Sequence, residues 1–328
     1  MHYQDLLKQF RERTVVVVGD VCLDRYILGR PTRLSREAPI AVLEWSREYS
    51  LPGAASNPAL NLVSLGARAS VVGVTGVDSA AQELSDLLLA RGAMTDGLVA
   101  DPARRTTEKT RILAEGLLVL PQQMARIDRT DPSPLMAERE EDLCAMIRQL
   151  APQADALLLS DYQGGVASAT VIACVWEAAR ERGILTTVDS QGDLARFAGL
   201  DCVRCNRHEA EAVLGHSLTT EEAFRSALPE LQKRVGCGIL VITRDAEGVS
   251  FYSAEDGYGY IPSVPVPVAD GVGAGDTFIS VLTLVLASGG SLGRAAHVAN
   301  RAAALVVQHV GNAYPSPEEL LQILEADA

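Results

Sequence analysis

Short apolar segments alternate along this chain with segments of helical pattern, and several of the latter end at glycine. The apolar segments span residues 14–19, 69–74, 156–160, 185–188 and 238–243. The helical segments span residues 56–65, 79–91, 168–182 and 276–288. Uninterrupted apolar strands between helices are typical of a parallel sheet that helices cover on both faces. We therefore predict a single Rossmann-like α/β domain over residues 1–328, with ligands binding at the carboxyl ends of its strands.

Two arginine-bearing stretches, residues 22–50 and 104–128, interrupt this alternation. They contain alternating segments at residues 40–45, 110–113 and 117–120, which predict short antiparallel strands. The net charge of residues 22–50 and 101–128 together is +2. The net charge of the whole chain is −13, so the remaining residues have a net charge of −15. We predict a small β-sheet lid over the ligand-binding end, with local positive charge for an anion. Because such a sheet has open edges and one apolar face, we expect a homodimer through the lid.

Several classes of partner and location are disfavoured. The net charge of −13 argues against nucleic acid, and no apolar run approaches the roughly 20 residues of a membrane helix. The polar first 13 residues predict a helix rather than a signal peptide, so we expect a cytoplasmic protein with reduced cysteines. Cys202 and Cys205 form a CxxC, but no further paired ligands accompany it, so we expect no zinc site.

A glycine-rich loop precedes the predicted helix at residues 276–288. Glycines let a backbone approach a ligand closely, and a helix start offers unpaired N–H groups and partial positive charge. We predict that Gly273, Ala274 and Gly275 form an anion hole for a phosphate in transfer. Asp276, at the rim, would accept the proton of an attacking hydroxyl. The alternative is a plain glycine-rich turn capped by Asp276.

The two common phosphate-binding loops are absent from the sequence. A dinucleotide-binding GxGxxG should follow the first strand, but Gly19-Asp20 and Asp24 stand there. A Walker loop needs Gly-Lys-Ser/Thr, which does not occur. The predicted phosphate site is therefore of a different type.

Four motifs together resemble the PfkB (ribokinase-like) carbohydrate kinases, over essentially the whole chain. They are Gly19-Asp20 with Asp24, residues 53–57, Asn206 with Glu209, and residues 270–276. Further similarity, to the D-glycero-D-manno-heptose 7-phosphate kinases of that family, lies in residues 19–26, 35–39, 107–111, 160–162, Gln123, Arg126 and Asp128. The resemblance implies a ribokinase-like fold, a homodimer, and transfer of the ATP γ-phosphoryl group to the anomeric hydroxyl of a sugar phosphate. Since the chain ends soon after the kinase-like region, we also expect no fused nucleotidyltransferase domain.

The resemblance also implies roles for single residues. The residues expected to bind the sugar phosphate are Asp20, Asp24, Arg36, Gly53, Asn57, Lys109, Arg111 and Asp161. Those expected near ATP are Asn206, Thr243, Gly273, Gly275 and Asn300. Glu209, with Asn206, would hold Mg²⁺ through water, and a monovalent cation behind the anion hole is left open. For Asn57 the alternative is a helix cap, and for Arg36 a surface pair with Glu37.

Three positions depart from the heptose kinases. Gly164 and Gln191 stand where those kinases typically have lysine, and Val272 stands where the family has threonine. The chain thus lacks two positive charges and a hydroxyl that could contact phosphate. This leaves two alternatives open, another sugar kinase of the family and a non-catalytic sugar-phosphate-binding relative. Asp276 favours the enzyme, since a binding protein has little need of a base.

Overall fold

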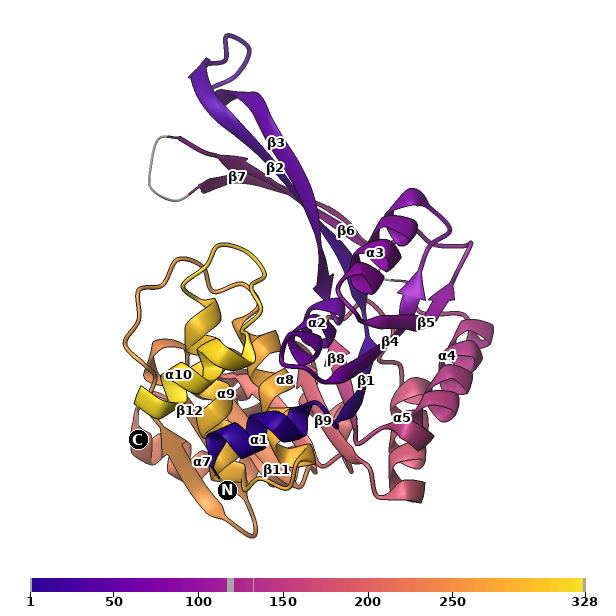
Figure 1. Cartoon of the computed structure of the whole chain (residues 1–328), viewed down its shortest axis with the longest axis vertical. Helices are drawn as coiled ribbons and strands as arrows, with labels where there is room; N and C mark the ends of the chain where they lie inside the picture. Colours follow the sequence, from indigo (N-terminus) through magenta and orange to yellow (C-terminus); the bar gives the residue numbers. More distant parts are fainter. Residues whose placement is uncertain (1, 117–120, 132, 327–328) are drawn as a thin grey trace.

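The main body is built on one large, mostly parallel sheet (Figure 1). The structure is a computed structural model that describes residues 2–116, 121–131 and 133–326. In spatial order the strands are β13 (Gly257–Ile261), β12 (Val249–Ser253), β11 (Ile239–Thr243), β10 (Cys202–Asn206), β9 (Leu185–Ser190), β8 (Ala156–Asp161), β1 (Thr14–Gly19), β4 (Arg68–Thr75) and β5 (Met94–Ala100). In this spatial order, all the strands from β11 through β5 run parallel to one another. Strands β12 and β13 add an antiparallel pair beside β11. The predicted parallel fold is confirmed.

Helices cover both faces of this sheet. The hydrophobic cluster on one face includes side chains of α1 (Tyr3–Phe10), α2 (Ser56–Ser64), α3 (Ser79–Ala90), α8 (Ala274–Ala287), α9 (Leu292–Val306) and α10 (Pro317–Ala326). The opposite cluster includes α4 (Ala137–Leu150), α5 (Ala169–Arg182), α6 (Arg207–Leu214) and α7 (Glu221–Val235). Short 3₁₀ helices occupy Ala151–Gln153, Leu194–Phe197 and Asp245–Glu247.

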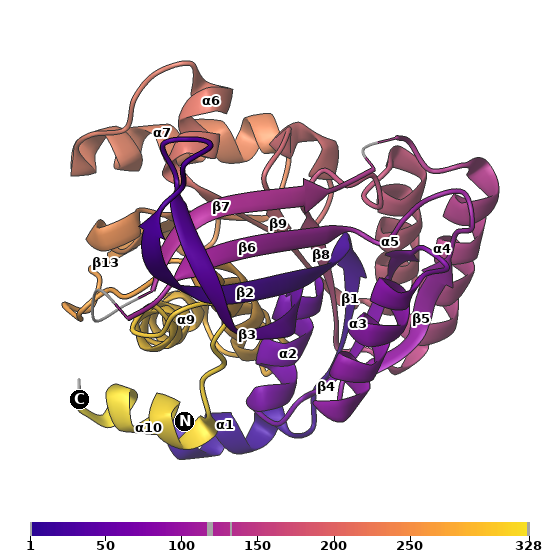
Figure 2. The ribbon, with the colours of Figure 1, turned by 90° about the horizontal axis from the view of Figure 1, so that it is seen from above.

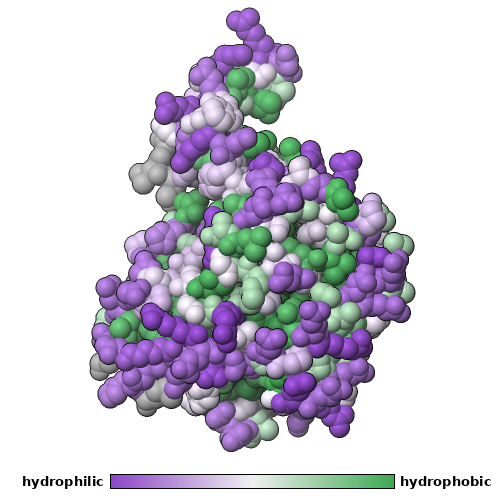
Figure 3. Space-filling view, turned by 45° about the vertical axis from the view of Figure 1, so that its right-hand side comes forward, coloured by the Kyte–Doolittle hydropathy of each residue, from purple (hydrophilic) through white to green (hydrophobic). Residues whose placement is uncertain are grey.

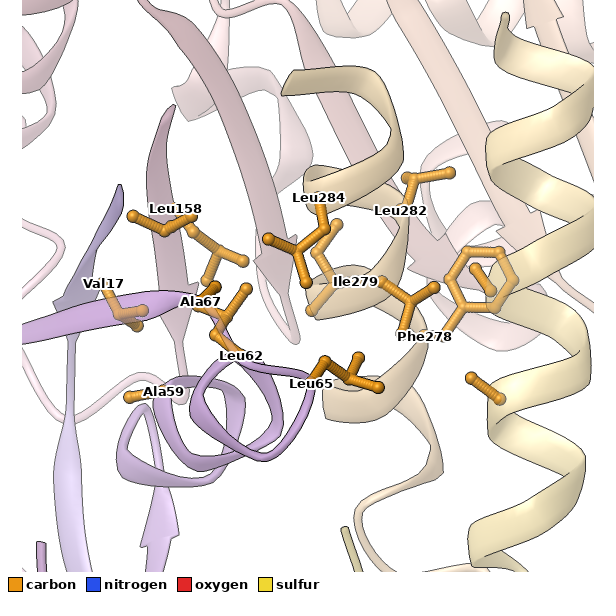
Figure 4. Close-up of a cluster of buried hydrophobic side chains, with 14 of the residues drawn as sticks. Val17, Ala59, Leu62, Leu65, Ala67, Leu158, Phe278, Ile279, Leu282 and Leu284 are labelled. Carbon is orange, nitrogen blue, oxygen red and sulfur yellow. The ribbon is translucent and has the colours of Figure 1, made fainter. Parts of the chain in front are cut away.

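Strand β1 shows why its apolar run is uninterrupted. Val15 and Val17 belong to the first cluster, whereas Val16 and Val18 belong to the second. Successive side chains of a strand point to opposite faces, so both faces of β1 are buried. Figure 4 shows Val17 and Leu158 of the sheet packed near side chains of α2 and α8, among them Leu62. This packing fixes α8, and with it the glycine loop, above the sheet.

A second sheet, which we call the lid, projects from the carboxyl end of β1 (Figure 1). Its strands, in spatial order, are β3 (Ala41–Ala54), β2 (Val21–Leu34), β6 (Glu108–Ala114) and β7 (Gln122–Arg129). Viewed from above, the lid strands cross the top of the main body (Figure 2). The predicted lid is confirmed.

Two details of the predicted lid were wrong. We expected short antiparallel strands, but β2 and β3 are 14 residues long each, and β2 pairs with β6 in parallel. Irregular pairing between Leu28 and Gly29 and between Pro31 and Arg33 breaks the alternation of side chains, which hid the full length of these strands. The strand expected at residues 117–120 lies outside the described residues.

Two further properties concern the whole described chain. All six cysteines are free and buried. Among the described residues, no helix has both the length and the apolar character that a bilayer crossing requires.

Candidate active site

The predicted anion hole lies at the start of α8, which begins at Ala274 rather than at residue 276. Gly273 has φ +78° and precedes the helix, a conformation that glycine adopts without strain. A Cβ atom on Gly275 would lie 2.8 Å from Arg204 Nη1. Gly273 thus adopts a conformation that disfavours side chains, and Gly275 leaves room for the Arg204 guanidinium. The first turn of α8 presents its N–H groups at the carboxyl end of the sheet.

Asp276 lies in the first turn of α8 and is only 5% exposed. Asn57 Nδ2 donates a hydrogen bond of 2.6 Å to Oδ2, and Tyr162 Oη donates one of 2.7 Å to Oδ1. Burial raises the pKa of Asp276 to about 7, and nearby Asp189 adds to the rise, while the two hydrogen bonds and Arg204 oppose it. A carboxylate with a pKa near neutrality is suited to proton transfer.

Asn57 does not cap its helix. Ala55, which has no side-chain acceptor, precedes α2, and Asn57 donates to Asp276 instead. The two helices also meet through Thr277 Oγ1, which donates to Asn61 Oδ1 at 2.7 Å. Helix α2 therefore holds Asp276 in place.

Arg204 lies in β10 beside the anion hole. Its Nη1 donates to Asp189 Oδ1 at 2.8 Å, and its Nη2 donates to Thr243 Oγ1 at 2.6 Å. In the parallel register Asp189 of β9 is the partner of Arg204, whereas Thr243 of β11 is the partner of Asn206, two residues further along β10. Reasoning from the sequence missed Arg204 and the contact of Tyr162 with Asp276. The available signal for Arg204 was a charge inside an otherwise apolar strand.

Asp20 and Asp161 order the loop that follows β8. Asp20 accepts backbone N–H groups from Tyr162, Gly164 and Val166. Asp161 is buried and accepts hydrogen bonds from Gln163 N–H and Ser190 Oγ. The structure thus brings both carboxylates to the site, where both accept hydrogen bonds from protein groups. Contact of either with a sugar stays a prediction.

The departures at Gly164 and Gln191 lie next to each other. A Cβ atom on Gly164 would lie 2.7 Å from Asp20 Oδ1. Gln163 Nε2 donates to the Gln191 carbonyl at 2.9 Å, so it joins the loops after β8 and β9. A side chain at position 164 would require this loop to move.

The predicted lid residues divide into two groups. Arg111 Nη1 donates to Asp24 Oδ1 at 2.7 Å, and Lys109 Nζ lies 5.4 Å from the centre of the Tyr162 ring. Gly53 packs against Asp24, since a Cβ there would lie 2.3 Å from Asp24 Oδ2. These residues adjoin the site at the base of the lid. Arg36, by contrast, is exposed in the connection between β2 and β3. This connection lies at the far end of the lid (Figure 1).

The predicted nucleotide residues also differ in placement. Asn206 and Glu209 form a reciprocal pair, in which Asn206 N–H donates to Glu209 Oε2 at 2.6 Å and Glu209 N–H donates to Asn206 Oδ1 at 2.9 Å. Thr243 contacts Arg204. Asn300 is buried in α9 and donates to the Pro262 carbonyl, which orders that segment.

A magnesium ion would find few protein ligands here. The described residues contain no group of three or more His, Cys, Asp or Glu side chains placed to hold a metal. Asn206 and Glu209 supply amide and carboxylate oxygens at one helix start. This set fits a hydrated Mg²⁺ that takes its remaining ligands from phosphates and water, as Mg²⁺ commonly does.

Known proteins match the chain along most of its length. The model of the family described as "pfkB family carbohydrate kinase" matches residues 12–319. The bifunctional protein HldE of Geobacter metallireducens is 38% identical over 319 residues, which cover 97% of this chain and 64% of that protein. The bifunctional protein HldE of Pelobacter propionicus is 37% identical, with the same coverage of 97% and 64%. The chain thus spans about 64% of the length of these relatives.

Solved structures agree on the fold. Phosphofructokinase-2 from Escherichia coli, in complex with potassium, has a TM-score of 0.79 at 20% identity and covers 96% of this chain and 98% of its own. Ribokinase from Arabidopsis thaliana, complexed with ribose and ATP, has a TM-score of 0.73 at 19% identity, with 95% and 98% covered. With the family match over residues 12–319, the chain belongs to the pfkB family of carbohydrate kinases, which confirms the expected enzyme class.

Proposed function

We propose that this protein transfers the γ-phosphoryl group of ATP to a hydroxyl of a sugar phosphate, and that the acceptor is the anomeric hydroxyl of a heptose 7-phosphate. The observation that carries the proposal is the environment of Asp276. A buried carboxylate, with its pKa raised to about 7, lies directly beside the glycine-bounded start of α8. A base and an anion site are thus adjacent, as transfer to a hydroxyl requires.

The residues of the site suggest how the reaction proceeds. Asp276 accepts the proton of the sugar hydroxyl while that oxygen forms a bond to the γ-phosphorus. The bond between this phosphorus and the bridging oxygen of ADP breaks, and the N–H groups at Gly273–Gly275 bind the phosphoryl oxygens. Asn206 and Glu209 would hold Mg²⁺ through water, and the ion supplies charge neutralisation for the phosphates.

The phosphate of the sugar would face the base of the lid. Lys109 and Arg111 lie on the face of β6 that also carries the contacts to Tyr162 and Asp24. Guanidinium and ammonium groups are the usual partners of phosphate. We therefore assign these two residues to the substrate phosphate, and Asp24 and Asn57 to its hydroxyls.

The lid supports the proposal of a homodimer. Ile27 and Ile112 are register partners, and Ile127 pairs with Thr110, so these side chains lie on the same face of the lid, opposite Arg111. Ile127 is 55% exposed. Figure 3 shows hydrophobic surface on the projecting lid. A second lid packed on this face would bury it.

A substrate panel tests the function. We expect ADP to form when the protein is incubated with ATP, Mg²⁺ and D-glycero-D-manno-heptose 7-phosphate, and to form more slowly with hexose 6-phosphates and with sugar 1-phosphates. Faster turnover of another sugar phosphate would move the assignment to a different sugar kinase of the family. Tight sugar-phosphate binding with no turnover on any member would instead favour a non-catalytic binding protein.

A further inference from the structure

Arg204 occupies a position where a positive charge is costly. Its neighbours Val203 and Cys205 are fully buried, and its own side chain is 13% exposed. A charge removed from water needs partners, and Asp189 and Thr243 supply them. These two residues bind one N–H on each terminal nitrogen. A guanidinium has five N–H donors, so others are left.

The guanidinium also lies against the first turn of α8. A Cβ atom on Gly275 would lie 2.8 Å from Nη1, 3.1 Å from Nη2 and 3.2 Å from Cζ of Arg204. A helix start carries partial positive charge and favours anions, so a cation beside it is unfavourable by itself. Asp189 offsets part of this charge, and an anion shared between the helix start and Arg204 would offset it further.

The free donors of Arg204 point to the same conclusion. Nε of Arg204 is buried and has no hydrogen-bond partner in the described part of the chain. Nε of several other arginines, Arg139 among them, is also buried without a partner in the described residues, so what distinguishes Arg204 is where its guanidinium lies, against the first turn of α8. Arginine matches phosphate oxygens in a planar, two-pronged geometry.

We propose that Arg204 binds the phosphoryl group in transfer, together with the N–H groups at Gly273–Gly275, and that Asp189 and Thr243 hold its guanidinium for this contact. The inference rests on the proposed function of the same site. Arg204 keeps its proton throughout. The γ-phosphorus changes its bond from the ADP oxygen to the sugar oxygen, and the hydroxyl proton goes to Asp276. Arg204 would also return one positive charge to a site that lacks lysine at positions 164 and 191.

The simplest competing role is structural, in which Arg204 only neutralises Asp189. Three variants separate the roles: Arg204→Met, Arg204→Lys, and Arg204→Met combined with Asp189→Asn. The double variant removes both charges, so it avoids leaving a buried carboxylate without a partner. Arg139→Met is the matched control, because Arg139 is 17% exposed, pairs with Asp142, and lies in α4.

The measurement is the affinity for MgATP and for MgADP by titration calorimetry, without sugar. Contact with the terminal phosphate predicts that Arg204→Met weakens ATP binding about 10- to 100-fold more than ADP binding. We expect the double variant to lose the preference for ATP over ADP to the same extent. Arg204→Lys should lose less of this preference, and Arg139→Met should keep it. Equal losses for ATP and ADP, or recovery of ATP affinity in the double variant, would overturn the proposal.

This readout is independent of the sugar. If no sugar phosphate is turned over, the proposed function fails, while the ratio of ATP to ADP affinity still decides the role of Arg204. If turnover is normal and the ratio is unchanged by Arg204→Met, the kinase stands and the assignment of Arg204 is wrong.

Discussion

At the scale of the residue, Asp276 is held between donors from two different elements. Asn57 belongs to α2, and Tyr162 follows β8. Both hydrogen bonds stabilise the ionised carboxylate, whereas burial and Asp189 favour the protonated form. The balance leaves the pKa of Asp276 at about 7, well above the ordinary value of 3.8.

The first prediction concerns pH. Because the base must be ionised, we expect kcat/KM to rise with pH around an apparent pKa near 7. Tyr162→Phe removes a hydrogen bond that lowers the pKa of Asp276, so its profile should shift to higher pH. Tyr252→Phe, in β12, should leave the profile in place. A pH–rate series measures this, and an unshifted or acid-shifted profile for Tyr162→Phe would contradict the assigned contact.

The sequence predicted a base at Asp276 and an anion hole at the glycines because each of these residues has a distinctive chemistry at a fixed spacing. It did not predict the partners of Asp276, since Asn57 and Tyr162 are 219 and 114 positions away along the chain. Reasoning from the sequence also passed over Arg204, which was considered only as part of the CxxC at Cys202 and Cys205, although a charge inside an apolar strand was an available signal. Contacts between loops of different strands depend on the packing of the sheet, which spacing in one chain does not reveal.

At the scale of the element, the proposed anion hole depends on the close packing at the start of α8. The second prediction compares two glycines of one loop. Gly275→Ala would place a methyl group 2.8 Å from Arg204 Nη1, whereas nothing lies within 4 Å of a Cβ on Gly271. We expect Gly275→Ala to lower kcat about 10²-fold by displacing groups at the anion hole. Gly271→Ala should stay near the wild-type rate, and equal rates for both variants would argue against a close-packed anion hole at Gly275.

Elements with strong patterns were predicted well. The bounds of strands β1 and β8 and helices α2 and α5 agree closely with the predicted segments. The strands are recognisable because both of their faces are buried, and the helices because a glycine follows them. Strands β5, β10, β12 and β13 of the main sheet were not predicted. Their side chains include several half-buried and polar residues, so they lack an uninterrupted apolar run.

At the scale of the whole molecule, the lid extends one sheet away from the body (Figure 1). The outer face of the lid carries Ile27, Ile112 and Ile127, and Trp45 nearby is 67% exposed. Apolar side chains on a projecting sheet are stable when a partner covers them. The lid could be predicted from charge and alternation, and the homodimer expected from its apolar face stays a prediction, since one chain does not show what covers that face.

The third prediction follows from this surface. Sedimentation velocity should show a dimer for the wild type and a monomer for Ile127→Asp, since a buried charge at the interface is costly. Leu89→Asp is the control, because Leu89 in α3 is equally exposed at 55% but lies outside the lid. A wild-type monomer, or dimers of equal strength for both variants, would contradict a dimer through the lid.

The central claim is that Asp276 is the base of a sugar-phosphate kinase. Its most direct test is the rate of ADP formation by wild type and Asp276→Asn with MgATP and D-glycero-D-manno-heptose 7-phosphate, alongside sugar-phosphate binding to both. We predict turnover by the wild type, a fall of about 10²- to 10⁴-fold in kcat for the variant, and nearly unchanged binding. An Asp276→Asn variant as fast as the wild type would contradict the claim.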